Sequence, residues 1–600
     1  MPKMHNFAKS AKTPRGAALS RLVAIALAGG ASLAAFAGDT YKITAKNGVG
    51  DVDALTNAIA QLNKGNTTDA KILLAPGVYN LKGYYTYLNG TVQKAHLYIN
   101  TAMKNGLIAG TGPSPGDTVL IGGGQEDNKG VFHIWTGDAS KPTVVSNLTM
   151  TGGYKASDDA GAIYGSDYLI IRDCIVSNNY ASGLGAGVLR AKMYNCLIAN
   201  NRSKSKNGAG FWSNNAGQGA DGCIFSNNTT TASGGGFYAE GANGFLLNCK
   251  FYDNSANGNG SGAYVSGASS IVSNCTFRGN APTAGASSSK FGGGLYLSSG
   301  ECVDCKFFEN SADRGGGAYI GAKTVVVRDC QFEGNKQTGW ASGAAIFVNA
   351  SSPLALVSNC VFNANVAAVQ SSRTIISNAD LVDCTISNHT LTVGYVTAGC
   401  NMTRCLFYDN RTQGSDSAQH LDIGTIYGGT VVSRTNVNCV IVNNKSTGSA
   451  NNAITEGKTI VSCTYADNSV AASAGDIIRN CTAWNALLAN NTVAGNATDI
   501  KRTSLYLTNC VFTASSVAVD SPNFSRCKLV ASARFSETED GGPYDIRDAS
   551  PAFGAGVWED WMADAVGGLD FARRPRVMFG AIDVGALECQ YRPGFLLLMR

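Results

Sequence analysis

The sequence is poor in charge, in histidine and in long apolar runs. Charged residues make up 15% of the 600 positions, and histidine occurs five times. Beyond the amino-terminal segment, no stretch is apolar for long enough to cross a bilayer as a helix. Hydrophobic residues nevertheless reach 44%, which is too many for a disordered chain, and there are 72 glycines. The composition therefore indicates a folded protein that is rich in turns.

The amino terminus has the organisation of a secretory signal peptide. Five basic residues precede an apolar run from Leu22 to Ala35, and residues 35–37 read Ala-Phe-Ala. A retained membrane anchor is the alternative, but it needs about 20 apolar residues. We expect cleavage near Ala37, so that residues 1–37 are the signal peptide. The mature chain is then secreted, or lies at the cell surface or outer membrane.

Cleavage also changes the charge of the protein. The segment 1–37 holds five of the 47 basic residues and no acidic one, so 42 basic groups remain against 42 acidic ones. A chain without net charge gives no electrostatic reason to expect nucleic acid or an anionic membrane as a partner.

A repeat organises most of the mature chain. Fifteen of the eighteen cysteines lie in one register, with neighbours 17 to 34 residues apart. An apolar residue stands two positions after each cysteine, and asparagine stands five positions after eleven of them. A period of two marks one face of a strand, and repeats of roughly 20–50 residues are typical of solenoids. The columns comprise Cys174, Cys196, Cys223, Cys249, Cys275, Cys305, Cys330, Cys360, Cys384, Cys405, Cys439, Cys463, Cys481, Cys510 and Cys527, then Phe251, Phe277, Phe307 and Phe332 among the apolar residues, and Asn228, Asn254, Asn280, Asn310 and Asn335 among the asparagines.

Each period holds two or three short strands separated by Asn and Gly turns. The residue before each cysteine is usually Asp or Asn, which indicates a bend. The recurring asparagine is expected to adopt the left-handed backbone of a tight turn and to hydrogen-bond along a stack of its own kind. Parallel stacking buries the apolar face that one repeat cannot bury alone. The sequence predicts an all-β, single-stranded right-handed parallel β-helix over residues 71–534.

Both ends of such a stack need covers, because unpaired strand edges invite aggregation. Residues 38–70 are predicted to form an N-terminal cap, in which Asp51 begins a short helix with one apolar side. From about Phe535 the register is lost, and Trp558 and Trp561 appear. Residues 535–600 are therefore predicted to form a small C-terminal cap or anchoring module.

Three segments resemble known families. The recurring Phe-x-x-Asn and Gly-Gly-Ala patterns, such as Phe251 with Asn254 and residues 316–318, resemble the repeats of polymorphic outer membrane proteins. Residues 53–79, a helix followed by Leu-Ala-Pro-Gly-Val-Tyr, resemble the start of pectate-lyase-like β-helix proteins. Residues 549–556 and 583–588 resemble the choice-of-anchor Q module of exported bacterial β-helix proteins, which implies surface display. The residues after Glu588 are too few for the membrane barrel of polymorphic outer membrane proteins.

The cysteines are expected to be reduced, buried and structural. Side chains at one repeat position point the same way, and parallel side chains fit the disulfide dihedral poorly. Disulfides are the alternative for an exported chain. Cys302 and Cys305 form a single C-x-x-C pair, which suggests a metal or redox site, but Cys302 also fits the apolar position of the repeat. Cys400 and Cys589 lie outside the register.

Asp158 and Asp159 are the candidates for a catalytic pair or a Ca²⁺ site. Clustered carboxylates beside Arg, Lys or His can bind Ca²⁺ or act as acid and base. A solvated turn is the alternative interpretation, and no other cofactor is expected. The histidines of the mature chain lack a glycine-flanked catalytic motif, and the tyrosines after the glycine clusters either stack on sugars or pack on strands. These residues are His96, His133, His389, which replaces a recurring asparagine, and His420, with Tyr238, Tyr264, Tyr296 and Tyr319.

Two functions are compatible with these features. The first is a non-enzymatic exported protein for adhesion or polysaccharide contact, with a polysaccharide or a host or cell-surface glycan as partner. The second is a pectate-lyase-like polysaccharide lyase or a glycoside hydrolase that acts on acidic glycans. Convergence of Asp158 and Asp159 with a basic residue and a histidine in one groove would favour the enzyme.

Overall fold

The computed structural model leaves the expected signal peptide, residues 1–37, as well as Trp558, Trp561 and Cys589, outside the described residues. The described residues are 39–64, 68–88, 91–136, 138, 140–283, 290–339, 342–349, 354–367, 374–392, 394–413, 420–427, 430–432, 434–447, 452–471, 475–493, 505–513, 524–535, 544, 546, 550–557, 562, 569–576 and 582–587.

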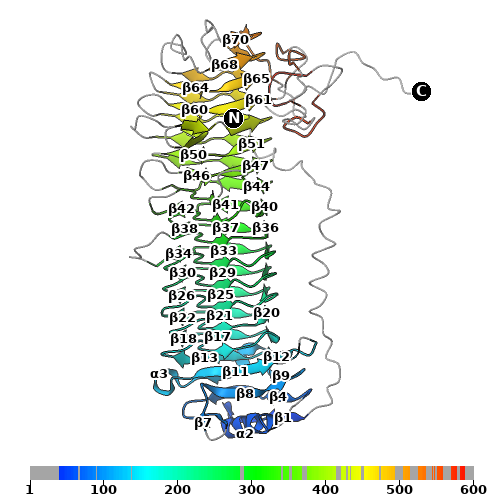
Figure 1. Cartoon of the computed structure of the whole chain (residues 1–600), viewed down its shortest axis with the longest axis vertical. Helices are drawn as coiled ribbons and strands as arrows, with labels where there is room; N and C mark the ends of the chain where they lie inside the picture. Colours follow the sequence, from blue (N-terminus) through cyan, green and yellow to red (C-terminus); the bar gives the residue numbers. More distant parts are fainter. Residues whose placement is uncertain are drawn as a thin grey trace, which may run out of the picture.

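Three parallel β-sheets run along the long axis and form the faces of a solenoid (Figure 1). They contain 19, 20 and 15 strands, and we name them sheets 1, 2 and 3 in that order. In one coil, β15 (Ile163–Tyr164) of sheet 3 leads to β16 (Leu169–Arg172) of sheet 1 and then to β17 (Ile175–Ser177) of sheet 2. Each strand pairs in parallel with its counterpart in the next coil. The predicted right-handed parallel β-helix is confirmed.

Sheet 2 shows the repeat most regularly, since its strands follow the cysteine positions. Each of these strands has three residues, and successive strands pair without a shift in register. After β17 they are β21 (Leu197–Ala199), β25 (Ile224–Ser226), β29 (Lys250–Tyr252), β33 (Thr276–Arg278), β37 (Lys306–Phe308), β41 (Gln331–Glu333), β45 (Val361–Asn363), β48 (Thr385–Ser387), β52 (Leu406–Tyr408), β58 (Val440–Val442), β62 (Thr464–Ala466), β66 (Leu487–Ala489), β69 (Val511–Thr513) and β71 (Lys528–Val530).

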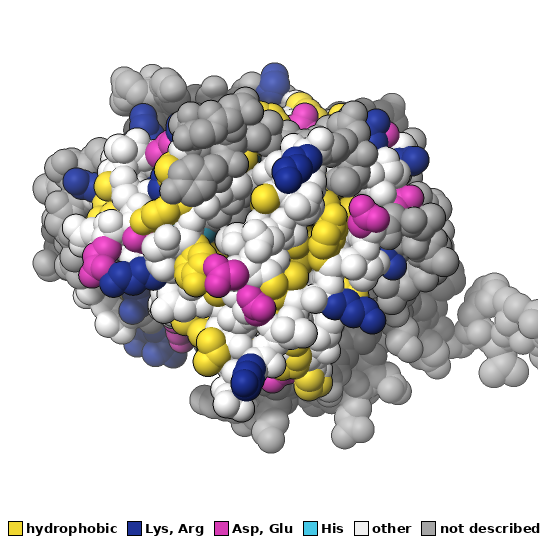
Figure 2. All heavy atoms as spheres, turned by 90° about the horizontal axis from the view of Figure 1, so that it is seen from below, with side chains coloured by type: hydrophobic (Ala, Val, Ile, Leu, Met, Phe, Trp, Pro, Cys, Tyr) yellow, Lys and Arg dark blue, Asp and Glu magenta, His cyan; other side chains and the backbone are white. Residues whose placement is uncertain are grey.

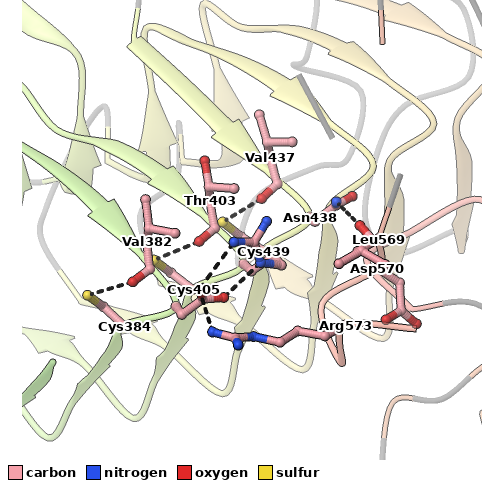
Figure 3. A network of polar contacts seen from close by, with 12 residues as sticks. Val382, Cys384, Thr403, Cys405, Val437, Asn438, Cys439, Leu569, Asp570 and Arg573 are labelled. Carbon is pink, nitrogen blue, oxygen red and sulfur yellow. Dashed lines mark hydrogen bonds and ion pairs between the residues drawn. The ribbon is translucent and has the colours of Figure 1, made fainter. Parts of the chain in front are cut away.

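The cysteine column lies inside the corner between sheets 1 and 2. The residue before each cysteine has a left-handed backbone, as at Asn248 with φ 54° and Asn274 with φ 51°, so the bend predicted there is confirmed. The thiols are buried and donate to carbonyl oxygens: Cys249 Sγ lies 3.4 Å from the carbonyl of Ala220. Figure 3 shows a second kind of thiol contact, from Cys384, Cys405 and Cys439 to the carbonyl oxygen of the residue two positions earlier.

Cys481 is the exception, and its assignment to this column is wrong. Ala486 stands there instead, because it precedes β66, the strand that pairs with β62. Cys481 precedes β65 (Thr482–Trp484), just as Cys400 precedes β51 (Asn401–Thr403), so these two thiols lie at the opposite end of sheet 1 strands. The offset of five positions from Cys481 to Ala486 corresponds to one short strand with its turn, which is why spacing alone misplaced the cysteine.

A ladder of buried asparagines follows sheet 2. Asn228 Oδ1 accepts from the backbone N–H and the Nδ2 of Asn201, at 3.1 and 3.0 Å, while Asn228 Nδ2 donates to Asn254 Oδ1 at 2.9 Å and to the carbonyl of Ile198 at 2.9 Å. The left-handed residue lies one position before the asparagine, as at Asn227 with φ 54°, and not on the asparagine as predicted. The ladder consists of Asn179, Asn201, Asn228, Asn254, Asn280, Asn310, Asn335, Asn365, His389, Asn410, Asn444, Asn468 and Asn491, all buried.

The phenylalanine column fills the space between the cysteines and the asparagines. Phe251 lies 4.8 Å from Phe225 and 4.7 Å from Phe277 between ring centroids, with the rings nearly parallel. The stack continues through Phe307, Phe332 and Phe362. Like side chains therefore lie on like side chains in the cysteine, phenylalanine and asparagine columns.

The N-terminal end is covered by helix α2 (Val52–Leu62), as predicted. Asp51 caps it by accepting the backbone N–H of Ala54 at 2.9 Å, and the apolar side of the helix is buried. The strand β1 (Thr40–Ile43) then pairs with β4 (Lys71–Leu74). Seen from this end, charged side chains of both signs are interspersed with hydrophobic ones (Figure 2).

The described part of the C-terminal segment packs on the flank of the last coils. The outer face of sheet 2 is apolar there, and Val440, Val442 and Leu487 are buried beneath residues such as Ile546 and Val584. In several upstream strands the corresponding position holds an exposed residue, for example Lys250 in β29. The segment is thus a lateral cover for an apolar face.

Polar contacts hold this cover at the corner between sheets 1 and 2 (Figure 3). Arg573 forms an ion pair with Asp383 at 2.7 Å, and Asn438 Nδ2 donates to the carbonyl of Leu569 at 2.6 Å.

Along the described parts of the chain, the helices are all too short or too polar to cross a membrane.

Replacement of Asn310 by alanine is expected to destabilise the stack strongly. It leaves the backbone N–H of Asn280 and the carbonyl of Phe277 without their buried partner, which costs about 3 kcal/mol or more in the free energy of unfolding. The control is Asn274→Gly, in the exposed left-handed corner, where we expect a loss below about 1 kcal/mol. Urea unfolding of both variants measures the difference, and equal losses would contradict the account.

His389 is expected to make the stack sensitive to acid. Its Nε2 lies 3.3 Å from Asn365 Nδ2 and its Nδ1 lies 2.9 Å from Asn410 Oδ1, so the neutral ring takes the place of an amide. Burial lowers the pKa of His389 to about 4, against the hydrogen bond to Asn410. The unfolded chain binds this proton below about pH 6.5, whereas the folded chain does not, so stability falls between pH 6.5 and 4 by about 3 kcal/mol.

The variant His389→Asn should lose this dependence, because asparagine carries no titratable group. Urea midpoints at pH 7 and pH 4.5 for the variant and the parent protein provide the test. The other histidines contribute equally to both proteins. An identical loss of stability in the two would show that His389 is not the acid-sensitive group.

Candidate functional site

One continuous row of mostly aromatic side chains lies on the outer face of sheet 3. The strands of this sheet pair in register, which places the outward residues of successive coils next to one another. The row is formed by Tyr98 in β8 (Ala95–Met103), His133 in β11 (Gly130–Thr136), Tyr164 in β15, Leu189 in β19 (Val188–Leu189), Trp212 in β23 (Phe211–Ser213), Tyr238 in β27 (Phe237–Ala239), Tyr264 in β31 (Ala263–Val265), Tyr296 in β35 (Leu295–Leu297), Tyr319 in β39 (Ala318–Ile320) and Phe347 in β43 (Ile346–Val348).

The rings of this row cover one another. Tyr264 lies 4.5 Å from both Tyr238 and Tyr296 between centroids, with interplanar angles of 5° and 11°. A sugar that stacks on a ring needs a free face, and these faces are occupied. The tyrosines therefore offer edges and hydroxyls: the hydroxyl of Tyr238 donates to Glu240 at 3.0 Å.

Trp135 is the aromatic residue with an open surface at the start of the row. It is 45% exposed and lies 5.6 Å from His133 between ring centroids. His133 is itself held between Tyr98 and Tyr164, each at 4.5 Å. This arrangement fixes the orientation of the histidine and places an accessible indole beside it.

A cluster of charges adjoins this end of the row. Asp158 Oδ2 lies 2.9 Å from Lys94 Nζ and 3.4 Å from Lys155 Nζ. Lys94 is mostly exposed, whereas the side chain of Lys155 is only 8% exposed and also donates to the carbonyl of Lys94 at 3.2 Å. Two ammonium groups thus share one carboxylate, which leaves the cluster with one positive charge in excess.

The surroundings shift the pKa of each group in the cluster. Burial lowers the pKa of Lys155, although the nearby Asp158 opposes the shift. Burial alone would raise the pKa of Asp158, but the hydrogen bond from Lys94, the backbone N–H of Asp159 and the charge of Lys155 outweigh it and hold the pKa below the ordinary value.

Burial and nearby positive charges also act on His133, so its imidazole is neutral at physiological pH. Burial, followed by the charges of Lys155 and Lys94, lowers the pKa of His133 to about 4. Its Nε2 is buried and has no hydrogen-bond partner among the described residues. The neutral imidazole thus lies beside a lysine whose pKa is also lowered by burial, so the site favours the unprotonated form of both groups.

A cleft of about 610 Å³ opens beside the cluster and spans four coils. Its lining includes Asp158, Asp159, Lys206, Trp212 and Glu240. Asp159 Oδ1 accepts the backbone N–H of Leu184 at 2.7 Å, so this carboxylate also positions the loop of the next coil. The cleft therefore presents carboxylates and an ammonium group around an aromatic side chain.

Two features of the structure concern the predicted Ca²⁺ site at Asp158 and Asp159. Asp158 is occupied by two ammonium groups, which compete with a metal ion for its oxygens. Where side chains are described, three or more histidine, cysteine, aspartate or glutamate residues do not gather in an arrangement that could hold a metal ion.

The sequence pointed to Asp158 and Asp159 but not to their partners. Lys94, His133 and Lys155 come from three stretches that precede the first ladder cysteine. The cysteine repeat does not extend to these stretches, so it could not predict that the three residues lie close together. Outward alternation in the strand 130–136, where His133 and Trp135 share one face, was the signal available.

The remaining histidines of the mature chain lie in other parts of the fold. His96 accepts the backbone N–H of Gly123 at 3.1 Å through Nε2 and contacts the carbonyl of Tyr84 at 2.7 Å through Nδ1, so it joins two loops. His389 belongs to the asparagine ladder. His420 begins β54 (His420–Ile423), and its side chain lies outside the described part.

Comparison with known proteins identifies the fold. Residues 194–372 match the family described as "Right handed beta helix region". The search of curated proteins found no match. The match covers the coils with the most regular asparagine ladder.

Solved structures with a similar fold include three glycan-acting proteins. A GH87 alpha-1,3-glucanase catalytic domain in complex with nigerose is 11% identical, with a TM-score of 0.22 and coverage of 77% of this chain and 67% of that one. A mannuronic acid specific polysaccharide family 6 lyase from human gut microbiota is 13% identical, with a TM-score of 0.23 and coverage of 82% and 91%. The A-module of the Azotobacter vinelandii mannuronan C-5 epimerase AlgE6 is 13% identical, with a TM-score of 0.20 and coverage of 80% and 96%. Likeness at this level says nothing about substrate.

The lowered pKa of His133 should depend on Lys155. The variant Lys155→Met removes the second-largest cause of the shift, so the pKa of His133 should rise toward its ordinary value while burial still keeps it below that value. Histidine-labelled protein followed by NMR between pH 3.5 and 8 measures this. A pKa of His133 that is unchanged in the variant would contradict the proposed proximity of the two groups.

Proposed function

We propose that the protein is exported and binds an acidic polysaccharide on the outer face of sheet 3, at the coils that carry the charged cluster. The convergence of Lys94, Lys155, Asp158 and His133 beside the exposed Trp135 is the observation that carries the proposal. The excess positive charge of this cluster offers a partner for a carboxylate, and Trp135 offers an apolar face for a sugar ring.

The shape of the site suits a polymer. The cleft spans four coils, and the row of tyrosine edges continues from it along the same face. Sugar hydroxyls can donate to Asp159 and Glu240 and accept from Lys206, since all three line the cleft. A chain of sugars that lies parallel to the long axis would meet similar chemistry at successive coils.

Adhesion and surface display remain part of the proposal. They are supported by the signal-like residues 1–37 and by the resemblance of residues 549–556 and 583–588 to an anchoring module. In this view, the β-helix presents the binding face, and residues 535–600 serve attachment.

A second candidate function is a lyase that acts on acidic glycans, and one observation favours it over a purely binding role. Burial lowers the pKa of both Lys155 and His133, which favours the unprotonated form that a general base requires. The exposed ammonium of Lys94 could neutralise the carboxylate of a uronate while the base removes the adjacent proton. A hydrolase is less well supported, because the low pKa of Asp158 keeps it ionised and unable to donate a proton.

A glycan array probed with the mature protein tests the binding function. We expect acidic polysaccharides to be retained, and the variants Lys94→Ala and Trp135→Ala to bind at least about tenfold more weakly. The matched control is Lys250→Ala, an exposed lysine on the outer face of sheet 2, which should bind like the parent protein. Retention of neutral glycans only, or equal loss in the control, would contradict the proposal.

An activity screen on the retained glycans separates the two candidates. A lyase releases products with an unsaturated sugar, which absorb ultraviolet light, and in Lys155→Met this activity should fall far more than binding does. Binding without any such product supports the non-enzymatic role.

A further inference from the structure

The core of the last coils contains a polar network in place of the apolar columns. Asp422 lies in β54 of sheet 3, and Lys458 begins β61 (Lys458–Val461) of sheet 1 in the following coil. Lys458 Nζ lies 3.0 Å from Asp422 Oδ1, and the two side chains are 0% and 2% exposed. Among the ion pairs of the described residues, no other has both side chains so completely buried.

The neighbours hold this pair in one orientation. Thr397 Oγ1 donates to Asp422 Oδ1 at 2.5 Å, and Asn436 Nδ2 donates to Asp422 Oδ2 at 2.8 Å. Lys458 Nζ also donates to the carbonyl of Cys400 at 2.6 Å. Each carboxylate oxygen therefore has a neutral donor, and the amine is aimed at the carboxyl group.

Such a pair is costly as ions. Each charge loses its hydration on burial, and the attraction between the two repays that cost only partly. In a dry interior, transfer of a proton from Lys458 to Asp422 removes both charges. The resulting amine and carboxylic acid are the two reactants of amide formation, already in contact.

We propose that Lys458 and Asp422 condense to an isopeptide bond that links two neighbouring coils from the inside. The cross-link is independent of glycan binding, because both residues lie in the core and the candidate site lies on the outer face of sheet 3 near the other end of the chain. Its role would be to staple the coils on which the C-terminal segment packs.

The reaction needs no oxidant, reductant or co-substrate. One proton of the Lys458 ammonium moves to Asp422 Oδ1, and the freed lone pair forms a bond to the Asp422 carboxyl carbon. The negative charge collects on Oδ2, where Asn436 donates a hydrogen bond. A second proton from the nitrogen moves to Oδ1, which Thr397 contacts, and the C–Oδ1 bond breaks to release water. An ammonium and a carboxylate are thereby converted into one amide and one water molecule.

Positioning makes this condensation feasible although it is unfavourable between free molecules in water. Groups held in reactive geometry behave as if present at effective concentrations of up to about 10⁵–10⁸ M. The burial of the pair also keeps bulk water from reversing the reaction. Asn436 and Thr397 act as positioning residues, since they orient the carboxyl group and do not change covalently.

Mass spectrometry of the denatured mature protein tests the proposal. The parent protein should be lighter than its sequence by one water, and its digest should contain one branched peptide that joins the segments around Asp422 and Lys458. Lys458→Met should show the full mass. The exposed pair Lys82 and Glu126 is the internal control and should be recovered unmodified.

Two further results make the test decisive. Asn436→Leu should slow the loss of water after refolding, so that a larger fraction of the chain stays unlinked at early times. If Lys458→Met does not fold, the digest of the parent protein alone suffices. Quantitative recovery of unmodified peptides containing Asp422 and Lys458 from the folded parent protein would overturn the proposal.

Discussion

The structure depends on a column of side-chain amides that is shut away from water. Each asparagine of the ladder accepts through Oδ1 from the coil before it and donates through Nδ2 to the coil after it, as Asn254 does between Asn228 and Asn280. A buried amide without these partners is costly, so each coil of the ladder places an amide, or at His389 an imidazole, at the same height. The ladder therefore sets the register in which cysteine meets cysteine and phenylalanine meets phenylalanine.

Because the register is set by side chains inside the solenoid, the residues on its outer faces can serve other functions. The ladders lie inside, and the side chains that point outward from sheet 3 are limited only by their neighbours along the row. Lys94, His133 and Lys155 come from different coils, and the parallel stacking brings them to one place. The same freedom explains the last coils, where an apolar outer face on sheet 2 receives the C-terminal segment.

The sequence predicts the repeating part of this fold well, because repetition makes one physical constraint visible many times. The strand after each cysteine, the bend before it and the asparagine stack all follow from fixed offsets. The left-handed residue was misplaced by one position because adjacent asparagines, such as Asn227 and Asn228, have the same propensity and differ only in burial. Cys481 was misplaced because a single residue type cannot distinguish the two corners of sheet 1.

The candidate site could be predicted only in part. Asp158 and Asp159 stand out as an acidic pair in a polar loop, but Lys155 looks like a solvated lysine until its burial is known. From the sequence, the tyrosines after the glycine clusters could stack on sugars. In the structure, the rings of successive coils stack on one another, so their faces are covered. The polar network around Asp422 and Lys458 has no repeat signature, since each of its members occurs once.

Quantitative labelling of thiols in the folded, unreduced protein tests the central claim most directly. The structure buries every described cysteine except Cys527, which is partly exposed, and has no disulfide among them. A small alkylating reagent should therefore leave the ladder thiols unmodified under native conditions and modify them all after denaturation without prior reduction. Rapid modification of most ladder thiols in the folded state, or their recovery as disulfides, would contradict a core built by stacking like residues.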